Sequence, residues 1–353
     1  MRIQCGQPES IIVIRPSAIG DIVMASPMLP RLRGTFPQAR IYWVVEPAMA
    51  DLLSHHPDLD GVILWPKQEW SRLLRKGRFA NFVRMVRSFR ATLAEKRPQL
   101  VLDAQGLLRS RFLSRLSGAP LRVGFNSKEP HLGLMTHIID RGPSTKHLGS
   151  EYHYMLDVLG IQPQRPEDVF PLGEDVIERA RSLLRREGVG GPYGVLAPFT
   201  TRPQKHWPED RWARVADVLR DDLAIEPIFL GGPRDQSSAK RIRNLCGGRV
   251  HVMCGKSNLL ESFAIVSGAS LTIGVDTGLT HMAMVQRRPA IALFGATCPY
   301  LFADGNQHRV LYHPLPCSPC KRSPVCDSNY PCMKAITVEE VIQTAKVLVG
   351  TDG

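Results

Sequence analysis

The fold of this chain is decided by the stretch Leu271-Thr272-Ile273-Gly274-Val275-Asp276-Thr277-Gly278-Leu279-Thr280-His281. Its first five residues form an apolar, partly β-branched run of strand length. The residues from Leu279 to Gln286 contain no helix breaker and predict a helix. A strand that enters a helix through a short turn places that turn at its carboxyl end. In an open α/β sheet this end faces the ligand crevice.

The polar turn at 276–278 fits either an anion-binding site or an ordinary helix cap. Free backbone N–H groups at the start of a helix bind phosphate. Asp276 could accept hydrogen bonds from sugar hydroxyls, and His281 lies one turn into the helix. The alternative is an N-cap Asp or Thr followed by a core-facing histidine. The stretch alone leaves both interpretations open.

The composition predicts a two-domain protein with an anionic partner. The chain has 353 residues, of which 43% are hydrophobic, and a formal net charge of +12. This charge favours a nucleotide, a nucleic acid or an acidic membrane surface as partner. The first residues lack the apolar core of a signal peptide, so we expect a cytoplasmic location. In that reducing compartment, eight cysteines favour thiols or metal ligands over disulfides.

Strand-length apolar runs alternate with helical patterns, which predicts an α/β fold of two Rossmann-like, doubly wound domains facing each other across a cleft. The expected strands are 11–15, 41–45, 62–65, 100–103 and 121–124 in the first half, and 193–197, 227–230, 250–253, 271–275 and 290–294 in the second. An apolar segment at 22–32 reads as one helix. We expect domains at 1–165 and 172–335, a linker at 162–171 and a terminal helix within 336–353.

Four polar turns follow predicted strands, two in each half of the chain. They are Ser17-Ala18-Ile19-Gly20-Asp21, Asp103-Ala104-Gln105-Gly106, the segment 200–208 (T-T-R-P-Q-K-H-W-P) and the turn after Val275. Each alone fits a cap or a loop. Together, at strand carboxyl ends, they predict a ligand site. The chain contains neither G-x-G-x-x-G nor a P-loop lysine motif, which argues against a dehydrogenase or a P-loop NTPase.

With these motifs the sequence resembles the glycosyltransferase family 9 heptosyltransferases, which extend the inner core of lipopolysaccharide. The matching pieces are S-A-I-G-D, D-A-Q-G-L, T-T-R-P-Q-K-H-W-P, V-D-T-G-L-T-H and Phe294-Gly295-Ala296-Thr297, in the same order over about residues 11–300. The resemblance implies a GT-B fold and ADP-L-glycero-β-D-manno-heptose as donor. It also implies inverting transfer to a lipid-linked Kdo/heptose acceptor.

The resemblance also implies roles for single residues. Asp21 matches the proposed general base. Thr200, Thr201 and Lys205 match the residues that hold the diphosphate, and Asp276 matches a sugar-hydroxyl ligand. A lysine aimed at the leaving diphosphate stabilises its growing charge, so the scheme needs no metal or other cofactor for catalysis.

Further donor contacts are implied around the helix start and after another strand. Thr277, Gly278 and Leu279 would offer backbone N–H groups to phosphate, and His281 matches a position near the pyrophosphate. Asp235 stands where the family has an acidic ribose contact, although the family residue is the longer Glu. In the first half, Asp103 is the rival general base, and its other interpretation is a turn residue.

A strongly basic stretch lies between Trp70 and Arg90. From Trp65 to Leu100 ten Lys/Arg face two acids. The stretch fits a solvated helix face, a nucleic-acid surface or a surface for an anionic acceptor at the inner membrane leaflet. Its aromatic spacing fits a buried helix face rather than base stacking, so we expect no nucleic acid. We predict acceptor binding at this stretch and peripheral contact of the protein with the inner membrane. The residues expected to bind the acceptor are Arg72, Arg75, Lys76 and Arg78.

On the strength of this resemblance, we predict an inverting transferase of L-glycero-D-manno-heptose from ADP-heptose to the lipopolysaccharide inner core, peripheral at the inner membrane. One alternative is a related GT-B enzyme that uses another nucleotide sugar, or a UDP-sugar epimerase. A non-enzymatic alternative is a basic zinc-knuckle protein that binds nucleic acid. The K-H-W-P segment and the carboxylates favour the enzyme, because a nucleic-acid binder has no need of them.

Four cysteines near the C-terminus could hold a structural zinc ion, remain free buried thiols or form an adventitious disulfide. They are Cys317, Cys320, Cys326 and Cys332. If all four thiolates bind zinc, elemental analysis of protein purified without added zinc should give about one zinc per chain. A fully active protein without metal would contradict the zinc hypothesis.

Overall fold

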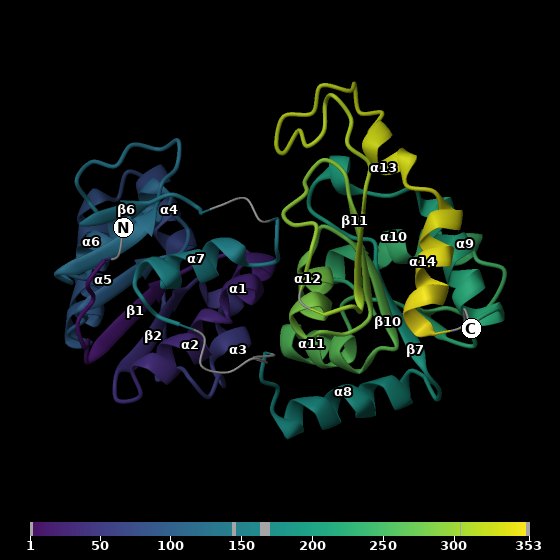
Figure 1. Ribbon diagram of the computed structural model, residues 1–353, viewed down its shortest axis with the longest axis horizontal. Helices are drawn as coiled ribbons and strands as arrows, with labels where there is room; N and C mark the ends of the chain where they lie inside the picture. Colours follow the sequence, from purple (N-terminus) through teal and green to yellow (C-terminus); the bar gives the residue numbers. More distant parts are fainter. Residues whose placement is uncertain (1–2, 143–145, 163–169, 304, 351–353) are drawn as a thin grey trace. The chain divides into compact units, whose positions relative to one another are not determined.

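The computed structural model describes residues 3–142, 146–162, 170–303 and 305–350 (Figure 1). The chain divides into two compact units. The first unit comprises residues 1–145 and 149–171, and the second comprises 146–148 and 172–353. Most of the predicted linker, residues 163–169, lies outside the described residues. Among the described residues, no helix is both long and apolar enough to cross a bilayer.

The first unit is a parallel six-stranded sheet with the order β3-β2-β1-β4-β5-β6. Its strands are β1 (Ser10–Ile14), β2 (Arg40–Val45), β3 (Gly61–Leu64), β4 (Leu100–Asp103), β5 (Leu121–Phe125) and β6 (His137–Ile139). Its helices are α1 (Ile19–Ala25), α2 (Met28–Thr35), α3 (Ala50–Leu53), α4 (Lys67–Arg75), α5 (Phe79–Glu95), α6 (Leu108–Leu116) and α7 (Ser150–Val158). The chain winds outward from β1 through β2 and β3, then returns to the other side of β1. The strand order therefore reverses between β1 and β4, where open α/β sheets bind ligands.

The predicted helix at 22–32 is wrong in its continuity, because the structure has the two helices α1 and α2 there. The last amide of α1 that bonds back into the helix is that of Ser26, which donates to the Ile22 carbonyl oxygen (N···O 2.9 Å). Pro27 has no N–H with which to continue this ladder. The apolar pattern spans both helices because each buries apolar residues, Ile22 and Val23 in α1 and Leu29 and Leu32 in α2.

The second unit repeats the design with the order β12-β11-β10-β7-β8-β9. Its strands are β7 (Tyr193–Ala197), β8 (Glu226–Phe229), β9 (His251–Val252), β10 (Leu271–Val275), β11 (Ala290–Phe294) and β12 (His308–Tyr312). Its α-helices are α8 (Glu174–Arg186), α9 (Glu209–Asp221), α10 (Gln236–Leu245), α11 (Leu259–Gly268), α12 (Gly278–Val285), α13 (Pro331–Ala335) and α14 (Val338–Val349). Figure 1 shows α11 and α12 on one face of this sheet and α9, α10 and α14 on the other. The predicted doubly wound α/β architecture is confirmed.

The terminal helix α14 belongs to the second unit. It buries Val338, Val341 and Ala345 in the same apolar cluster as residues of α9 and β10. Thr337 caps its start by accepting a hydrogen bond from the Glu340 amide (3.1 Å). Gly350 ends it in the left-handed conformation with φ 77°.

The close approach of β7, β10 and α12 depends on Gly274. A Cβ atom placed there would lie 2.9 Å from Ala197 Cβ, 3.2 Å from the Ala197 carbonyl oxygen and closest of all to Thr280 Oγ1. The Thr280 hydroxyl donates to the Val275 carbonyl oxygen at 2.6 Å, so it locks the turn from strand to helix. The absence of a side chain at Gly274 therefore sets the geometry of the turn at 276–278.

Gly274→Ala should lower the free energy of unfolding by about 1–3 kcal/mol, the usual cost of overpacking a core. Chemical denaturation measures this change. Gly190→Ala is the matched control, because no atom lies within 4 Å of a Cβ atom built there. Equal stability of the two variants would show that the strand and the helix do not need this close approach.

Candidate active site

The candidate site lies at the carboxyl ends of β7 and β10. These strands are neighbours, with Ala197 paired to Gly274, and the strand order reverses between them. The loop after β7 carries Thr200, Thr201 and Lys205, and β10 leads into Asp276. The structure thus brings the T-T-R-P-Q-K-H-W-P and D-T-G-L-T-H motifs together at a position typical of ligand binding.

An ion pair joins the two motifs. Lys205 Nζ lies 2.6 Å from Asp276 Oδ2, with the side chains 15% and 12% exposed. The loop that carries Lys205 is anchored through Trp207, whose buried indole N–H donates to the Ile336 carbonyl oxygen (3.0 Å). Gln204 adds a second anchor by donating from Nε2 to the Lys321 carbonyl oxygen (3.1 Å). Lys205 is therefore held in place from both sides along the chain.

Asp276 is the centre of a hydrogen-bond network. His281 Nε2 lies 3.1 Å from Asp276 Oδ1, and its Nδ1 lies 2.7 Å from the Tyr300 hydroxyl. The Thr297 hydroxyl donates to the other carboxylate oxygen. Burial raises the pKa of Asp276, but the hydrogen bond and charge of His281 and the charge of Lys205 outweigh it and hold the pKa below its usual range. Asp276 is thus an ionised acceptor at neutral pH.

Thr297 and Tyr300 were not assigned roles from the sequence. Both follow β11, the strand beside β10. The signal was the segment Phe294-Gly295-Ala296-Thr297 at the end of a predicted strand. Neighbouring parallel strands end at one edge of the sheet, so a hydroxyl after β11 can reach a carboxylate after β10.

The start of α12 offers backbone N–H groups beside this network. Thr277 occupies the N-cap position in extended conformation, and among the described residues no side chain caps the helix start. The first N–H groups of a helix lack partners within the helix. The amides of Gly278 and Leu279 are therefore available to hydrogen-bond an anion next to Lys205 and Asp276.

The remaining predicted donor residues lie on the neighbouring loops. Thr200 is half-buried and Thr201 is exposed. The carbonyl oxygen of Thr200 accepts from the ring of His206 (Nε2···O 2.9 Å). Asp235 follows β8, the strand on the other side of β7, and its Oδ2 accepts from the Gly232 amide (2.8 Å). One oxygen of Asp235 thus supports its own turn.

In the first unit, Asp21 lies at the carboxyl end of β1 in the first turn of α1. Its Oδ2 lies 2.7 Å from Arg15 Nη2 and accepts from the Ala18 amide (3.2 Å), while the side chain stays 38% exposed. Arg15 is buried and also donates to the Ala104 carbonyl oxygen (3.1 Å). Arg15 therefore ties the loops after β1 and β4 together and orients an accessible carboxylate.

Asp103 has the opposite surroundings. It is fully buried and accepts hydrogen bonds from the amides of Gln105 (3.0 Å) and Gly106 (2.9 Å) and from the Ser110 hydroxyl (2.9 Å). Burial raises the pKa of Asp103, and these hydrogen bonds counteract part of the rise. Its interpretation as a turn residue is confirmed by these contacts.

The predicted acceptor residues lie in the connection from β3 to β4. Arg72 and Arg75 belong to α4, and Lys76 and Arg78 to the turn before α5. All four are exposed. Arg72 pairs with Glu69 at 2.5 Å. These positions suit both an acceptor surface and the solvated helix face, so acceptor binding stays a prediction.

The cysteine segment follows β12. Cys332 is buried, and Cys317, Cys320 and Cys326 are half-buried free thiols. Across the described parts of the chain, no three His, Cys, Asp or Glu side chains gather closely enough to hold a metal ion. The structural zinc ion stays a prediction.

A D-x-D triplet, which metal-dependent sugar transferases commonly use, occurs at Asp58-Leu59-Asp60. It precedes β3, so it lies at the amino edge of the first sheet, whereas Asp21 lies at the carboxyl edge. Asp60 Oδ2 pairs with Arg33 Nη2 (2.5 Å) and accepts from the Ile41 amide (2.8 Å). The triplet therefore serves the fold of the first unit.

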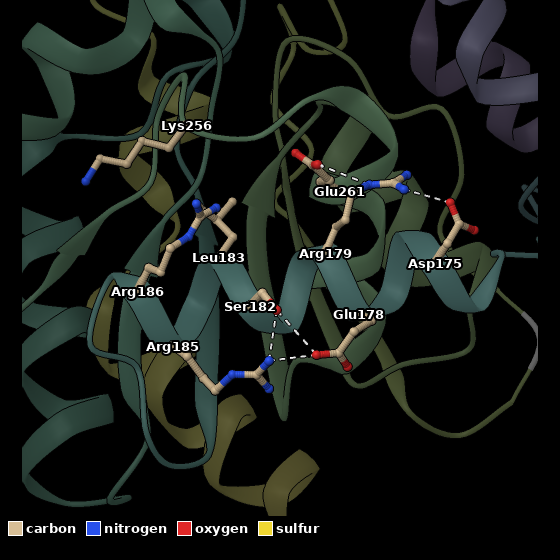
Figure 2. Close-up of a pocket in the computed structure, with 9 residues that line it drawn as sticks. All are labelled: Asp175, Glu178, Arg179, Ser182, Leu183, Arg185, Arg186, Lys256 and Glu261. Atoms are coloured by element: carbon tan, nitrogen blue, oxygen red, sulfur yellow. Dashed lines mark hydrogen bonds and ion pairs between the residues drawn. The ribbon is translucent and has the colours of Figure 1, made fainter.

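An open hollow of about 650 Å³ along α8 shares no residue with the candidate site (Figure 2). Its lining comprises Asp175, Glu178, Arg179, Ser182, Leu183, Arg185, Arg186, Lys256 and Glu261. Arg179 Nη1 pairs with Asp175 (2.7 Å), and Arg185 Nη2 pairs with Glu178 (2.6 Å). These pairs hold Arg179 and Arg185 against acidic residues of the same helix.

The model of glycosyltransferase family 9 (heptosyltransferase) matches residues 86–330. The chain belongs to this family. The family 9 enzyme is 27% identical over 316 residues to lipopolysaccharide heptosyltransferase 1 of an Escherichia coli strain, covering 85% of this chain and 90% of that protein. It is therefore a glycosyltransferase.

Solved structures support the fold of the family 9 enzyme. A glycosyltransferase family 9 protein of Veillonella parvula superposes with a TM-score of 0.80 at 22% identity, covering 100% of this chain and 99% of the other. The E. coli heptosyltransferase WaaC with ADP-2-deoxy-2-fluoro heptose gives a TM-score of 0.72 at 25% identity, covering 96% and 99%. The predicted GT-B class, with two Rossmann-like domains, is confirmed.

Asp276→Asn should destabilise the enzyme at pH 7, by about 1–3 kcal/mol, because Lys205 loses its carboxylate in a buried setting. The folded state lowers the pKa of Asp276, so its contribution is present above the unfolded pKa of about 4 and is lost as the pH falls through the folded value. The stability gap between wild type and variant should therefore narrow in acid. Chemical denaturation at several pH values measures it.

The matched control is Glu187→Gln, which breaks the more exposed pair of Glu187 with Lys256 (2.5 Å). An exposed pair contributes about 0–1 kcal/mol. Equal effects of the two substitutions would contradict the central position of Asp276.

Proposed function

We propose that this enzyme transfers L-glycero-D-manno-heptose, with inversion, from ADP-heptose to a lipid-linked Kdo/heptose acceptor of the lipopolysaccharide inner core. The observation that carries the proposal is the cluster of Lys205, Asp276 and His281 beside the uncapped start of α12. A cation and a helix terminus suit a diphosphate, and an ionised carboxylate suits sugar hydroxyls. The related proteins, whose names specify lipopolysaccharide heptosyltransferase 1, support the same sugar and pathway.

The leaving group in this reaction is a nucleoside diphosphate. Negative charge grows on its β-phosphate as the bond to the heptose breaks. Lys205 and the amides of Gly278 and Leu279 would stabilise that charge without reorganising, because Asp276 and the anchored loop already hold them in place. Thr200, Thr201, Thr277, His281 and Asp235 would complete the donor contacts.

Asp21 is the proposed general base. It is a partly exposed carboxylate held by Arg15 and by the Ala18 amide. A positioned carboxylate can take the acceptor proton late in the reaction, when the developing bond has made the hydroxyl acidic. Arg15 would act through Asp21 as a positioning residue.

We further propose that the enzyme works in the cytoplasm at the inner membrane surface. The acceptor is lipid-linked and anionic, and Arg72, Arg75, Lys76 and Arg78 would bind its charged groups. The reaction scheme requires neither an organic cofactor nor nucleic acid.

A thermal-shift panel of nucleotides tests the donor. ADP and ADP-heptose should raise the melting temperature by mass action, whereas UDP should not. Stabilisation by UDP and not by ADP would show that the donor is a UDP-sugar, and it would favour an epimerase or another transferase.

Lys205→Ala should lower kcat by on the order of a hundredfold or more, with a smaller change in donor affinity, because charge on the diphosphate increases in the transition state. Steady-state kinetics and ADP titration separate the two effects. Lys256→Ala is the control, since the ion pair of Lys256 is with the partly exposed carboxylate of Glu187. A rise in donor KM alone would make Lys205 a binding residue without a catalytic role.

Asp21→Asn should lower kcat by about 10²–10⁴, the usual contribution of general acid–base catalysis, while ADP affinity and thermal stability change little. The amide keeps the shape of the side chain but cannot take the proton. Asp103→Asn is the comparison, and it should affect stability more than turnover because Asp103 is buried in its turn. Full activity of a folded Asp21→Asn enzyme would assign the base elsewhere.

A further inference from the structure

The helical hairpin of α4 and α5 presents an unusual mixture of apolar and basic side chains to solvent. Phe79 is 64% exposed, Leu74 44% and Val83 43%. Exposed basic residues surround them, and we define the hairpin face as Leu74, Phe79 and Val83 together with Arg75, Lys76, Arg78, Arg84, Arg87 and Arg90. Large apolar side chains grouped on a surface mark an interaction site more often than isolated ones do.

Helical geometry places three members of the hairpin face in one row along α5. Successive residues advance by about 100°, so Phe79, Val83 and Arg87 at spacings of four lie side by side. Arg90 continues this row, and Arg84 lies beside it. Phe89 and Leu93 are buried on an adjoining side of α5. The apolar residues of the hairpin face are therefore additional to those that the fold needs.

The inner side of the hairpin is held firmly to the first unit. Trp70 of α4 is buried and packs edge to face on Phe82 and Phe89 of α5, with ring centroids 5.7 and 5.5 Å apart. Leu73 is buried beside it. A rigid scaffold thus carries the outer face, and substitutions on that face should leave the fold intact.

The basic groups of the hairpin face have no acidic partner among the described residues. In the described structure, no carboxylate forms an ion pair with the basic residues of the hairpin face that we defined. The Glu69 carboxylate is paired with Arg72. Long basic side chains can lie along an apolar surface while their charged ends reach outward to anions.

We propose that the hairpin face docks on an anionic phospholipid bilayer. Phe79, Leu74 and Val83 enter the boundary between headgroups and acyl chains, and the surrounding basic groups bind lipid phosphates. Amphipathic helices with apolar and basic residues on one surface bind membranes through these two contributions, which reinforce each other. The inference rests on the proposed function only for the biological role of docking, because a lipid-linked acceptor lies in a bilayer.

The apolar residues separate this partner from the other common polyanion. Nucleic acid would pair with the same arginines, but it would gain little from Leu74 and Val83, which cannot stack on bases. A bilayer uses both kinds of side chain. The face therefore fits a membrane better than a nucleic acid.

The experiment is vesicle flotation of the full chain with phosphatidylcholine vesicles that contain or lack phosphatidylglycerol. Wild type should float with the anionic vesicles and not with the neutral ones, and added salt should weaken this binding. Two triple variants divide the contributions: Leu74→Ser/Phe79→Ser/Val83→Ser and Arg84→Gln/Arg87→Gln/Arg90→Gln. Each should reduce partitioning at least tenfold.

The matched control is Lys240→Gln/Arg243→Gln/Leu245→Ser on α10, where exposed basic residues also neighbour an exposed leucine. It should partition like wild type. Absence of wild-type binding to anionic vesicles, or full binding by the apolar triple variant, would overturn the proposal. Tighter binding to duplex DNA than to vesicles would assign the face to nucleic acid instead.

An ADP thermal shift measured on the same proteins distinguishes this inference from the proposed function. All variants should keep the ADP shift, because the donor residues belong to the second unit. A normal ADP shift without vesicle binding would refute the docking proposal but not the proposed transferase function. Vesicle binding without an ADP shift would refute the proposed ADP-linked donor but not the docking proposal.

Discussion

The ion pair between Lys205 and Asp276 is the interaction on which the rest of the site depends. It joins the loop after β7 to the turn after β10, with both groups largely buried. A buried charge requires a partner, so each residue fixes the position of the other. His281, Tyr300 and Thr297 extend the pair into a network around the start of α12. This network therefore fixes the positions of the side chains in the candidate site.

The fold of the second unit brings the two residues of this ion pair together. Parallel strands end at one edge of the sheet, and the strand order reverses between β7 and β10, the position at which open α/β sheets bind ligands. Gly274 lets α12 begin close to β7. The first unit repeats this arrangement around Arg15, which links the loops after β1 and β4 and leaves Asp21 accessible.

The sequence predicted the features that depend on local chemistry. The central strands were recognisable because they are continuously apolar, and the paired motifs because they follow those strands. The edge strands β6 and β12 were missed, since both are partly exposed and carry mixed residues. The break at Pro27 was missed because α1 and α2 share one apolar pattern. Thr297 and Tyr300 received no role from the sequence, because their contact with Asp276 and His281 arises only when β11 lies beside β10.

The central claim is that the cluster around Lys205 and Asp276 holds the donor diphosphate. A crystal structure of the enzyme with ADP tests it most directly. We expect the diphosphate at the start of α12, within hydrogen-bond distance of Lys205 Nζ and the amides of Gly278 and Leu279. A diphosphate bound elsewhere, with the pair of Lys205 and Asp276 closed and uninvolved, would contradict it.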